Sequence, residues 1–231
     1  MFPIAILQND ELVPPGLLGD SLAIRRIPAK LIEVFRGESW PGLDEVSGLV
    51  MLGGHMGAYD EGEHPFLVRE KELVRSAVRR NLPLLGICLG CQIIADALGG
   101  QAYRVEPLEA GLVDLRVTEE GLRDSLGSAM EGPMASWHHD GWDLPPHGVL
   151  LASSDRYPQA LRVGSAVGVQ FHPEVTPGIL EGWIRRDGTA LLEIGLDPSR
   201  FLSEVEVSGE ALRDRADRLF GAWLAEVQSS L

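Results

Sequence analysis

A cysteine between two glycines is the feature of this sequence best suited to chemistry. Cys88 follows the apolar run Leu82–Ile87, and Gly86 and Gly90 stand two residues to either side of it. This spacing, between an apolar run and a helical pattern, is typical of a sharp turn that exposes a nucleophile at the end of a strand. The N-terminus of the following helix would stabilise negative charge on the sulfur. The backbone N–H of Leu89 would be available to an oxyanion.

A histidine and a glutamate two positions apart form a second reactive group. His172-Pro173-Glu174 follows the apolar run Val167–Phe171, which is predicted to be a strand. Residues two apart in an extended chain point the same way, and Pro173 disfavours the helical region for His172. Together with Cys88, they supply the parts of a thiol-nucleophile triad.

Two further stretches complete the pattern. Leu52-Gly53-Gly54 ends the apolar run 47–52, and Trp137-His138-His139-Asp140 lies in a region of predicted short strands. Taken with Gly-Ile-Cys-Leu-Gly-Cys-Gln and Gln-Phe-His-Pro-Glu, they resemble the class I glutamine amidotransferases over nearly the whole chain. The resemblance is strongest to small standalone members that look like the glutaminase half of GMP synthetase.

The resemblance implies a role for each of these residues. Cys88, His172 and Glu174 would be the catalytic triad, and the backbone N–H groups of Gly54 and Leu89 would hold the oxyanion. Gln92, Trp137 and His138 would bind the substrate, in the last two cases within a loop that acts mainly through its backbone. Gln92 lies four residues after Cys88, on the same face of the predicted helix. One difference is His55, where the family usually has proline.

The activity implied is hydrolysis of the glutamine side-chain amide through a thioester on Cys88. Family members pass the ammonia to an acceptor on a synthetase domain or subunit. No such domain is recognisable here, so we expect glutamine as substrate and a synthetase or other acceptor-site protein as partner.

Other functions fit parts of the pattern. The same site could act on larger γ-glutamyl amides, as γ-glutamyl hydrolases and peptidases of this fold do, or the triad could be idle in a regulatory protein. Cys88 and Cys91 form a Cys-x-x-Cys pair, which is also typical of thioredoxin-like redox proteins. A redox dithiol, however, does not need His172 and Glu174.

Metal and phosphate sites are less well supported by the sequence. A structural zinc site would normally show a second close pair of ligands, whereas His138 and His139 are adjacent and would point apart. The glycine-rich segment 53–57 lacks the spacing and the lysine of a phosphate loop. We therefore expect no metal and no cofactor.

Composition limits the class of protein further. The 231 residues suit one domain over residues 1–231, with a substantial core. The net charge of −14, from 34 acidic and 20 basic residues, argues against nucleic acid or an anionic membrane as partner. Basic pairs such as Arg185-Arg186 fit solvated helix faces. The sequence shows no signal peptide and no apolar stretch of transmembrane length, so we expect a cytoplasmic protein.

Apolar runs that alternate with helical patterns must position these residues. The alternation predicts an α/β fold: an open, mostly parallel sheet with helices on both faces, a nucleophile elbow and an antiparallel extension, of the flavodoxin-like kind. The expected strands are 3–7, 31–35, 48–52, 82–87 and 167–171, with short strands between 101 and 162. The expected helices are 65–80, with Pro65 at its first position, a helix that starts at 176–177 and stops at Gly188, and 209–229. Ligands of such folds bind at the carboxyl ends of the strands, where Gly54, Cys88 and His172 all fall.

Overall fold

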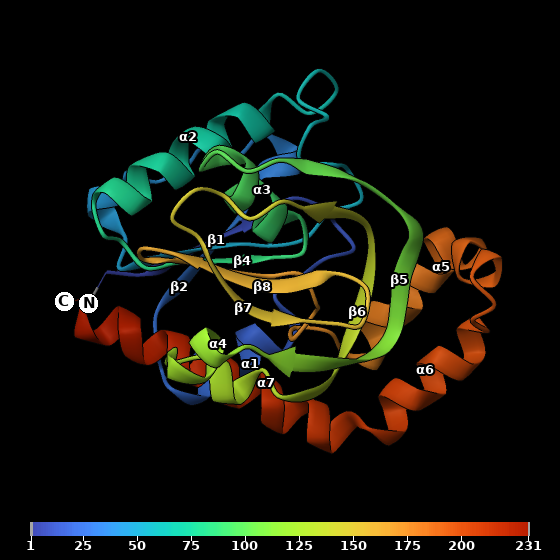
Figure 1. Ribbon diagram of the computed structural model, residues 1–231. Coiled ribbons are helices and arrows are strands. Elements are labelled where there is room, and N and C mark those ends of the chain that lie inside the picture. The colour runs from blue at the N-terminus through green and yellow to red at the C-terminus, as the bar shows by residue number, and fades with distance from the viewer. Residues whose placement is uncertain (1, 231) are drawn as a thin grey trace.

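The computed structural model describes residues 2–230, within which nine strands form one sheet with helices on both faces (Figure 1). The strands are β1 (Ile4–Gln8), β2 (Ala29–Glu33), β3 (Gly48–Met51), β4 (Leu84–Ile87), β5 (Ala102–Val117), β6 (Gly132–Trp142), β7 (Val149–Ser153), β8 (Pro158–Val163) and β9 (Ala166–Val169). The helices are α1 (Gly16–Ile24), α2 (Phe66–Arg79), α3 (Leu89–Ala97), α4 (Glu119–Arg123), α5 (Pro177–Glu193), α6 (Pro198–Val207) and α7 (Gly209–Ser229). Short 3₁₀ helices cover Val34–Arg36, Leu43–Glu45 and Gly127–Ala129.

The sheet has a parallel half and an antiparallel half. Its strand order is β2-β1-β3-β4-β9-β8-β7-β5-β6, and the pairs from β2 to β9 are parallel. From β9 onward every pair is antiparallel. The predicted α/β fold with an antiparallel extension is therefore confirmed. Because β4 and β9 are neighbours, Ile87 pairs with Val169 and the carboxyl ends of the two strands lie side by side.

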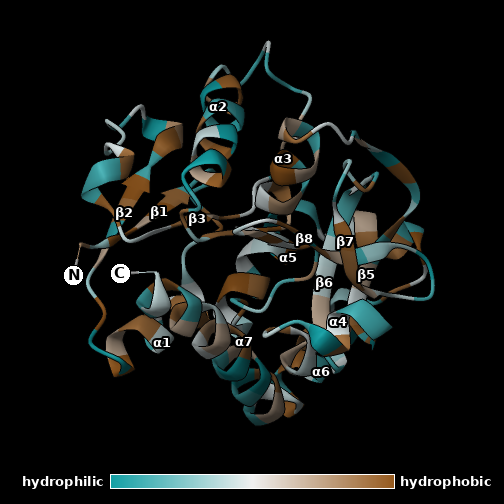
Figure 2. Cartoon of the chain, turned by 60° about the vertical axis from the view of Figure 1, so that its left-hand side comes forward, coloured by the Kyte–Doolittle hydropathy of each residue, from teal (hydrophilic) through white to brown (hydrophobic). Residues whose placement is uncertain are grey.

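The parallel strands are apolar on both faces because both faces are covered. Alternate residues of β1 enter different cores: Ile4 and Ile6 pack on the side of α1 and α7, whereas Ala5 and Leu7 pack on the side of α2 and α3. Figure 2 shows the central strands as hydrophobic segments between these two helical layers. This two-sided burial explains why the sequence reads as continuous apolar runs.

Several sequence-based expectations differ from the structure. The strand expected over 31–35 is β2, which ends at Glu33, and Val34–Arg36 form a 3₁₀ helix instead. The helix that begins at Pro177 does not stop at Gly188: α5 continues to Glu193 with a kink at Asp187. The region 101–162 holds two long strands, β5 and β6, that pair along most of their length, as well as short ones. Pro65 precedes the first residue of α2 and does not occupy its first position.

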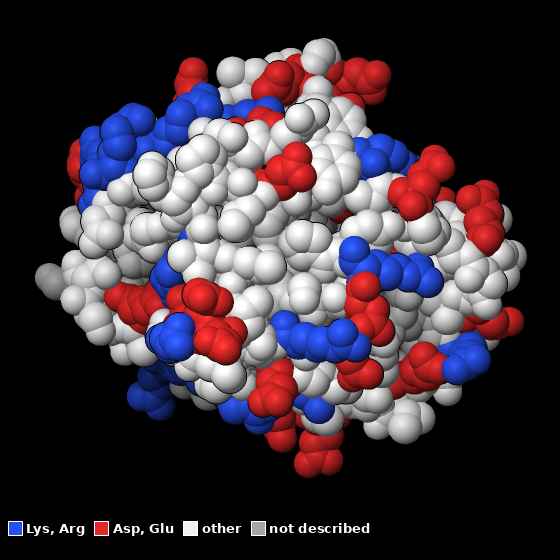
Figure 3. Space-filling view, viewed as in Figure 1, with Lys and Arg blue, Asp and Glu red and all other residues white. Residues whose placement is uncertain are grey.

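Basic side chains gather on one part of the surface, over α2 at the upper left of Figure 3, although the whole chain is acidic. Arg79 and Arg80 are exposed there, and Arg80 forms an ion pair with Asp44. Across residues 2–230, no helix is both long enough and apolar enough to cross a bilayer.

Candidate active site

Cys88 occupies a strained turn between β4 and α3. Its φ of 51° and ψ of −105° are unusual for a residue with a side chain, and its N–H donates to Val169 O at 2.8 Å. A Cβ on Gly86 would lie 2.4 Å from Gly90 O, and a Cβ on Gly90 would lie 2.2 Å from Met51 O. Any larger residue at either position would collide with backbone, which explains the two glycines around the cysteine.

His172 and Glu174 form a buried pair directly beside this turn. His172 comes three residues after the end of β9, where its N–H donates to Ala135 O at 2.8 Å. Its Nδ1 lies 2.7 Å from Glu174 Oε1, and the side chains are 4% and 0% exposed. Since Nδ1 is engaged by the carboxylate, Nε2 is the ring nitrogen left for the Cys88 thiol.

The electrostatics of this group favour an imidazolium. Burial lowers the pKa of His172, but the negative charges of Glu174 and Cys88 raise it by more, so the net pKa lies well above its usual range. Trp183 packs against His172, with ring centroids 4.6 Å apart and the rings tilted by 60°. The three predicted triad residues are therefore brought together in space.

The predicted oxyanion loop also reaches this site. Gly53 lies so close that a Cβ there would be 3.4 Å from His172 Cε1 and 3.5 Å from Cys88 Cβ. Gly54 follows in the pocket wall, and Leu89 is the first residue of α3. The N–H groups at the start of a helix lack partners within the helix, so Leu89 can offer its own to a ligand.

A small pocket, about 100 Å³ in volume, opens above Cys88. The predicted residues Gln92, Trp137 and His138 all line it. Further lining residues are Val13, His55, Met56, His139, Asp140, Trp183, Arg186 and Asp187.

The side chains of Gln92 and His138 are already engaged within the protein. Gln92 Nε2 lies 3.3 Å from both Asp140 O and Gln170 Oε1. His138 Nδ1 lies 2.8 Å from the same Asp140 carbonyl, and its Nε2 lies 3.3 Å from Glu109 Oε2. His138 is therefore held between Glu109 and the Asp140 backbone, which in turn holds Gln92 beside the cysteine.

Several pocket residues escaped the sequence reasoning. Arg186 belongs to an Arg-Arg pair that we expect on a solvated helix face, which is wrong for this residue because it lines the pocket. Its Nη1 lies 2.6 Å from Asp10 Oδ2, and His55 Nδ1 lies 2.6 Å from the same oxygen. Burial raises the pKa of Asp10, but its hydrogen bonds, including those from these two side chains, lower it overall. In the sequence, only the position of Asp10 just after β1 indicated that this residue could belong to the site, because ligands of such folds bind at the carboxyl ends of the strands.

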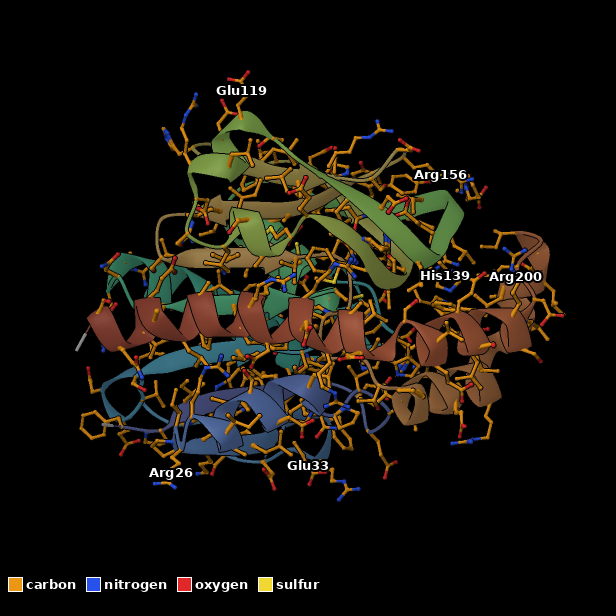
Figure 4. All side chains as sticks on the ribbon, turned by 90° about the horizontal axis from the view of Figure 1, so that it is seen from below. Arg26, Glu33, Glu119, His139, Arg156 and Arg200 are labelled. Atoms are coloured by element: carbon orange, nitrogen blue, oxygen red, sulfur yellow. The ribbon has the colours of Figure 1, made fainter. Side chains whose placement is uncertain are left out.

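Two aspartates, Asp140 and Asp187, also line the pocket. Asp187 Oδ2 lies 3.4 Å from His139 Nε2, and Tyr59 donates a hydrogen bond of 2.8 Å to Asp140. Figure 4 shows His139 beside the α5 and α6 helices; the residue lies within β6, where the pairing with β5 shifts register. The kink in α5 at Asp187 therefore coincides with the pocket wall.

Cys91 has a different environment from Cys88. It is fully buried, and burial raises its thiol pKa well above the usual range. A Cβ on Gly168 would lie 2.7 Å from its sulfur, so the side chain packs directly on β9. Among residues 2–230, no group of three or more His, Cys, Asp or Glu side chains is arranged to hold a metal ion.

Comparison with known proteins identifies the family of this chain. The family model for glutamine amidotransferase class-I matches residues 19–187. The chain is 33% identical over 168 residues to the glutamine amidotransferase-like protein YfeJ of Salmonella typhimurium, covering 69% of this chain and 70% of that protein. It is 31% identical over 193 residues to GMP synthase of Albidiferax ferrireducens, covering 79% of this chain and 31% of that protein. A solved glutamine amidotransferase from Methylobacillus flagellatus has a TM-score of 0.88 at 27% identity, covering 98% of this chain and 95% of the other.

Proposed function

Because the chain belongs to the class I glutamine amidotransferase family, we propose that it hydrolyses the side-chain amide of glutamine with Cys88 as nucleophile. The observation that carries this proposal is the strained Cys88 turn beside the buried His172–Glu174 pair, at the floor of a small pocket. A thiol, a base and an orienting carboxylate in this order perform acyl transfer.

The proposed reaction has two stages. The Cys88 thiolate attacks the amide carbon, and the N–H groups of Gly54 and Leu89 stabilise the oxyanion, an effect typically worth about 3 kcal/mol per donor. Protonated His172 gives its proton to the departing ammonia, which leaves a γ-glutamyl thioester on Cys88. His172 then takes a proton from water, the water attacks the thioester, and glutamate leaves as the thiolate is restored.

The charges around the pocket suit the amino-acid end of glutamine. One cation, Arg186, and two carboxylates, Asp140 and Asp187, line its wall. In this proposal Arg186 binds the α-carboxylate, and the two aspartates attract the α-ammonium group. Asp10 supports this role because it holds the guanidinium group in place.

In this proposal the ammonia passes to an acceptor site on a synthetase-type partner. The chain spans about a third of the GMP synthase that it resembles, and about half of the separate glutamine-hydrolysing GMP synthase subunit of Sulfolobus acidocaldarius. By analogy with these relatives, we propose one glutaminase domain in the cytoplasm that works with a synthetase-type partner.

A γ-glutamyl hydrolase is the second candidate. His55, at the pocket mouth, has a side chain that is 55% exposed, so the pocket opens to solvent and leaves space for an amide larger than that of glutamine. Rates on glutamine and on γ-glutamyl dipeptides, measured side by side, separate the two candidates.

Covalent labelling tests the nucleophile. A glutamine analogue with an electrophilic side chain should add one label, and peptide mapping should find it on Cys88. Cys88→Ala should lower the rate of glutamine hydrolysis by about 10⁴-fold or more, as removal of a triad member does. Cys91→Ser is the matched control and should keep most of the activity. Label on Cys91, or no label with every plausible partner present, would contradict the assignment and favour an idle triad.

A further inference from the structure

Glu109 carries a buried carboxyl group that the proposed reaction does not use. It lies on β5, and its side chain is 6% exposed. One oxygen, Oε1, accepts a hydrogen bond of 2.8 Å from Ser154 Oγ, and the other, Oε2, accepts one of 2.7 Å from Gln159 Nε2. Oε2 also lies 3.3 Å from Nε2 of His138, the one ion-pair partner of Glu109 among the described residues. Both oxygens are therefore held, as burial of a carboxyl group requires.

Donor and acceptor roles fix the orientation of the His138 ring. Its Nδ1 lies 2.8 Å from the backbone oxygen of Asp140, and a carbonyl oxygen can only accept, so Nδ1 carries a proton and donates it. The other ring nitrogen, Nε2, faces Glu109 Oε2 and lies 3.4 Å from Gln159 Nε2. The ring is 1% exposed, so it can turn only by giving up both contacts inside the protein.

The Asp140 carbonyl passes this constraint to Gln92. Gln92 Nε2 lies 3.3 Å from that carbonyl oxygen and 3.3 Å from Gln170 Oε1, so both of its N–H groups have acceptors within the protein. The side-chain oxygen of Gln92 is then the atom left to accept a hydrogen bond from a ligand in the pocket that Gln92 lines. Glutamine offers N–H donors at both of its ends.

The antiparallel half of the sheet supplies the fixed end of this chain of contacts. All four of its strands contribute a residue, either within the strand or directly after it: Glu109 in β5, His138 in β6, Ser154 after β7 and Gln159 in β8. Gln159 adds a second connection, because its backbone oxygen accepts a 2.7 Å hydrogen bond from the N–H of Gln170. The proposed triad contains no residue from these strands.

We propose that Glu109 is a positioning residue: it anchors the His138 ring, and through the Asp140 carbonyl it keeps the Gln92 amide turned with its oxygen toward the substrate. The antiparallel half of the sheet thereby controls how glutamine is recognised without touching it. This inference rests on the proposed glutaminase function and on the substrate-binding role expected of Gln92.

Loss of the anchor should weaken glutamine binding and leave the chemical step nearly intact. Without a partner at Nε2, the His138 ring can turn and withdraw Nδ1 from the Asp140 carbonyl, which then no longer fixes Gln92. Gln92 lies one turn along α3 from the sulfur of Cys88, so its contact is made equally before and during the reaction. Loss of such uniform binding raises KM and leaves kcat almost unchanged.

The kinetic test compares KM and kcat for glutamine. Glu109→Leu removes both oxygens and should raise KM about tenfold, as loss of a buried hydrogen-bond partner does. Glu109→Gln should restore most of the binding, because an amide offers both an acceptor and a donor to His138 Nε2. Asp114→Asn is the matched control, since it removes one negative charge at an exposed position of the same strand, and should follow the wild type.

A double variant tests whether Glu109 acts through His138. His138→Phe should raise KM as much as Glu109→Leu does, and the two changes together should raise it no further. Additive effects, a wild-type KM in Glu109→Leu, or a fall in kcat without a rise in KM would overturn the inference. Equal impairment of Glu109→Gln and Glu109→Leu would do so as well.

Nitrogen-15 NMR of labelled histidine reports on the anchor without turnover. The wild type should show a slowly exchanging Nδ1 proton that is missing in His138→Phe and retained in Glu109→Gln. The Nε2 resonance of His138 should shift in Glu109→Gln, because the group that faces it changes, and should stay in place in Asp114→Asn. These two variants keep the measurement decisive even if Glu109→Leu does not fold.

An unprotonated Nδ1 in the wild type, or an Nε2 resonance unchanged in Glu109→Gln, would overturn the inference. Absence of glutamine hydrolysis by the wild type with every partner would instead count against the proposed function. The NMR spectra would still show in that case whether Glu109 anchors His138.

Discussion

Glu174 uses one oxygen for His172 and leaves the other without a hydrogen-bond partner among the described residues. At the scale of single residues, the proposed mechanism therefore gives Glu174 two roles: it orients the ring and supports its positive charge. Glu174→Gln keeps an oxygen that can face Nδ1 but removes the charge that raises the pKa of His172. We expect a loss in kcat of about 10- to 10³-fold, against about 10⁴-fold or more for His172→Ala.

Steady-state rates of ammonia release from the two variants provide the measurement. The alkaline limb that depends on His172 should also move to lower pH in Glu174→Gln, because burial still lowers the pKa of the ring and the opposing charge is gone. Equal losses from both substitutions would mean that Glu174 does more than orient and support the imidazole.

Local spacing was sufficient to predict that His172 and Glu174 gather around Cys88, because these residues follow the ends of neighbouring strands. The family resemblance was needed for Gln92, Trp137 and His138, which lie inside α3 and β6.

Arg186 and Glu109 could not be predicted in either way. Arg186 reaches the pocket because α5 packs against the end of β1, where Asp10 holds it. Glu109 resembles the exposed acidic residues of β5 in sequence, and only the folded chain shows that its side chain is buried against His138.

At the scale of elements, the contact between β3 and α3 depends on Gly90. Alanine in a helix is normally favoured over glycine by about 1 kcal/mol. Here the added Cβ would lie 2.2 Å from Met51 O, so strand and helix would have to separate. Overpacking typically costs about 1–3 kcal/mol, and a clash with backbone belongs at the upper end of that range, above the gain in helix propensity.

We therefore expect Gly90→Ala to lower the free energy of unfolding in denaturant titrations and to lower glutaminase activity as well. Gly62→Ala is the matched control, because a Cβ there meets no atom within 4 Å, and it should leave both quantities unchanged. A stable and active Gly90→Ala variant would show that the turn can relax.

The bounds of a helix could be predicted where apolar residues recur at helical spacing without a break. The helix expected over 209–229 is α7, with the same bounds, because a regular apolar face continues along its whole length. The stop expected at Gly188 was wrong because a glycine alone does not end a helix: α5 kinks at Asp187 and resumes. The lengths of β5 and β6 depend on their pairing with each other, which no local pattern specifies.

At the scale of the whole molecule, the oxyanion loop is connected to the outer helices. His55, next to Gly54, is bound to Asp10, and Asp10 is bound to Arg186 on α5. A partner that contacts α5 could therefore shift the loop, and Gly53-Gly54 can change its peptide orientation at low cost because neither residue has a Cβ. We expect weak glutaminase activity from the isolated chain, which rises by about tenfold or more with the correct partner.

Ammonia release with and without each candidate partner measures this effect, and His55→Pro should alter the basal rate by stiffening the loop and removing its link to Asp10. Full turnover by the isolated chain, unchanged by His55→Pro, would favour an independent γ-glutamyl hydrolase.

The border between the two halves of the sheet also affects when the proposed active site can form during folding. Cys88 ends the parallel half, and His172 returns to it only after the chain has formed the antiparallel half between them. Closing so long a loop is entropically unfavourable, and native pairings between distant segments slow folding. A nascent or partly refolded chain can thus complete its first strands and still lack a base beside its thiol. We therefore expect activity to return during refolding only once β9 has docked against β4, so that the chain releases no ammonia before that step.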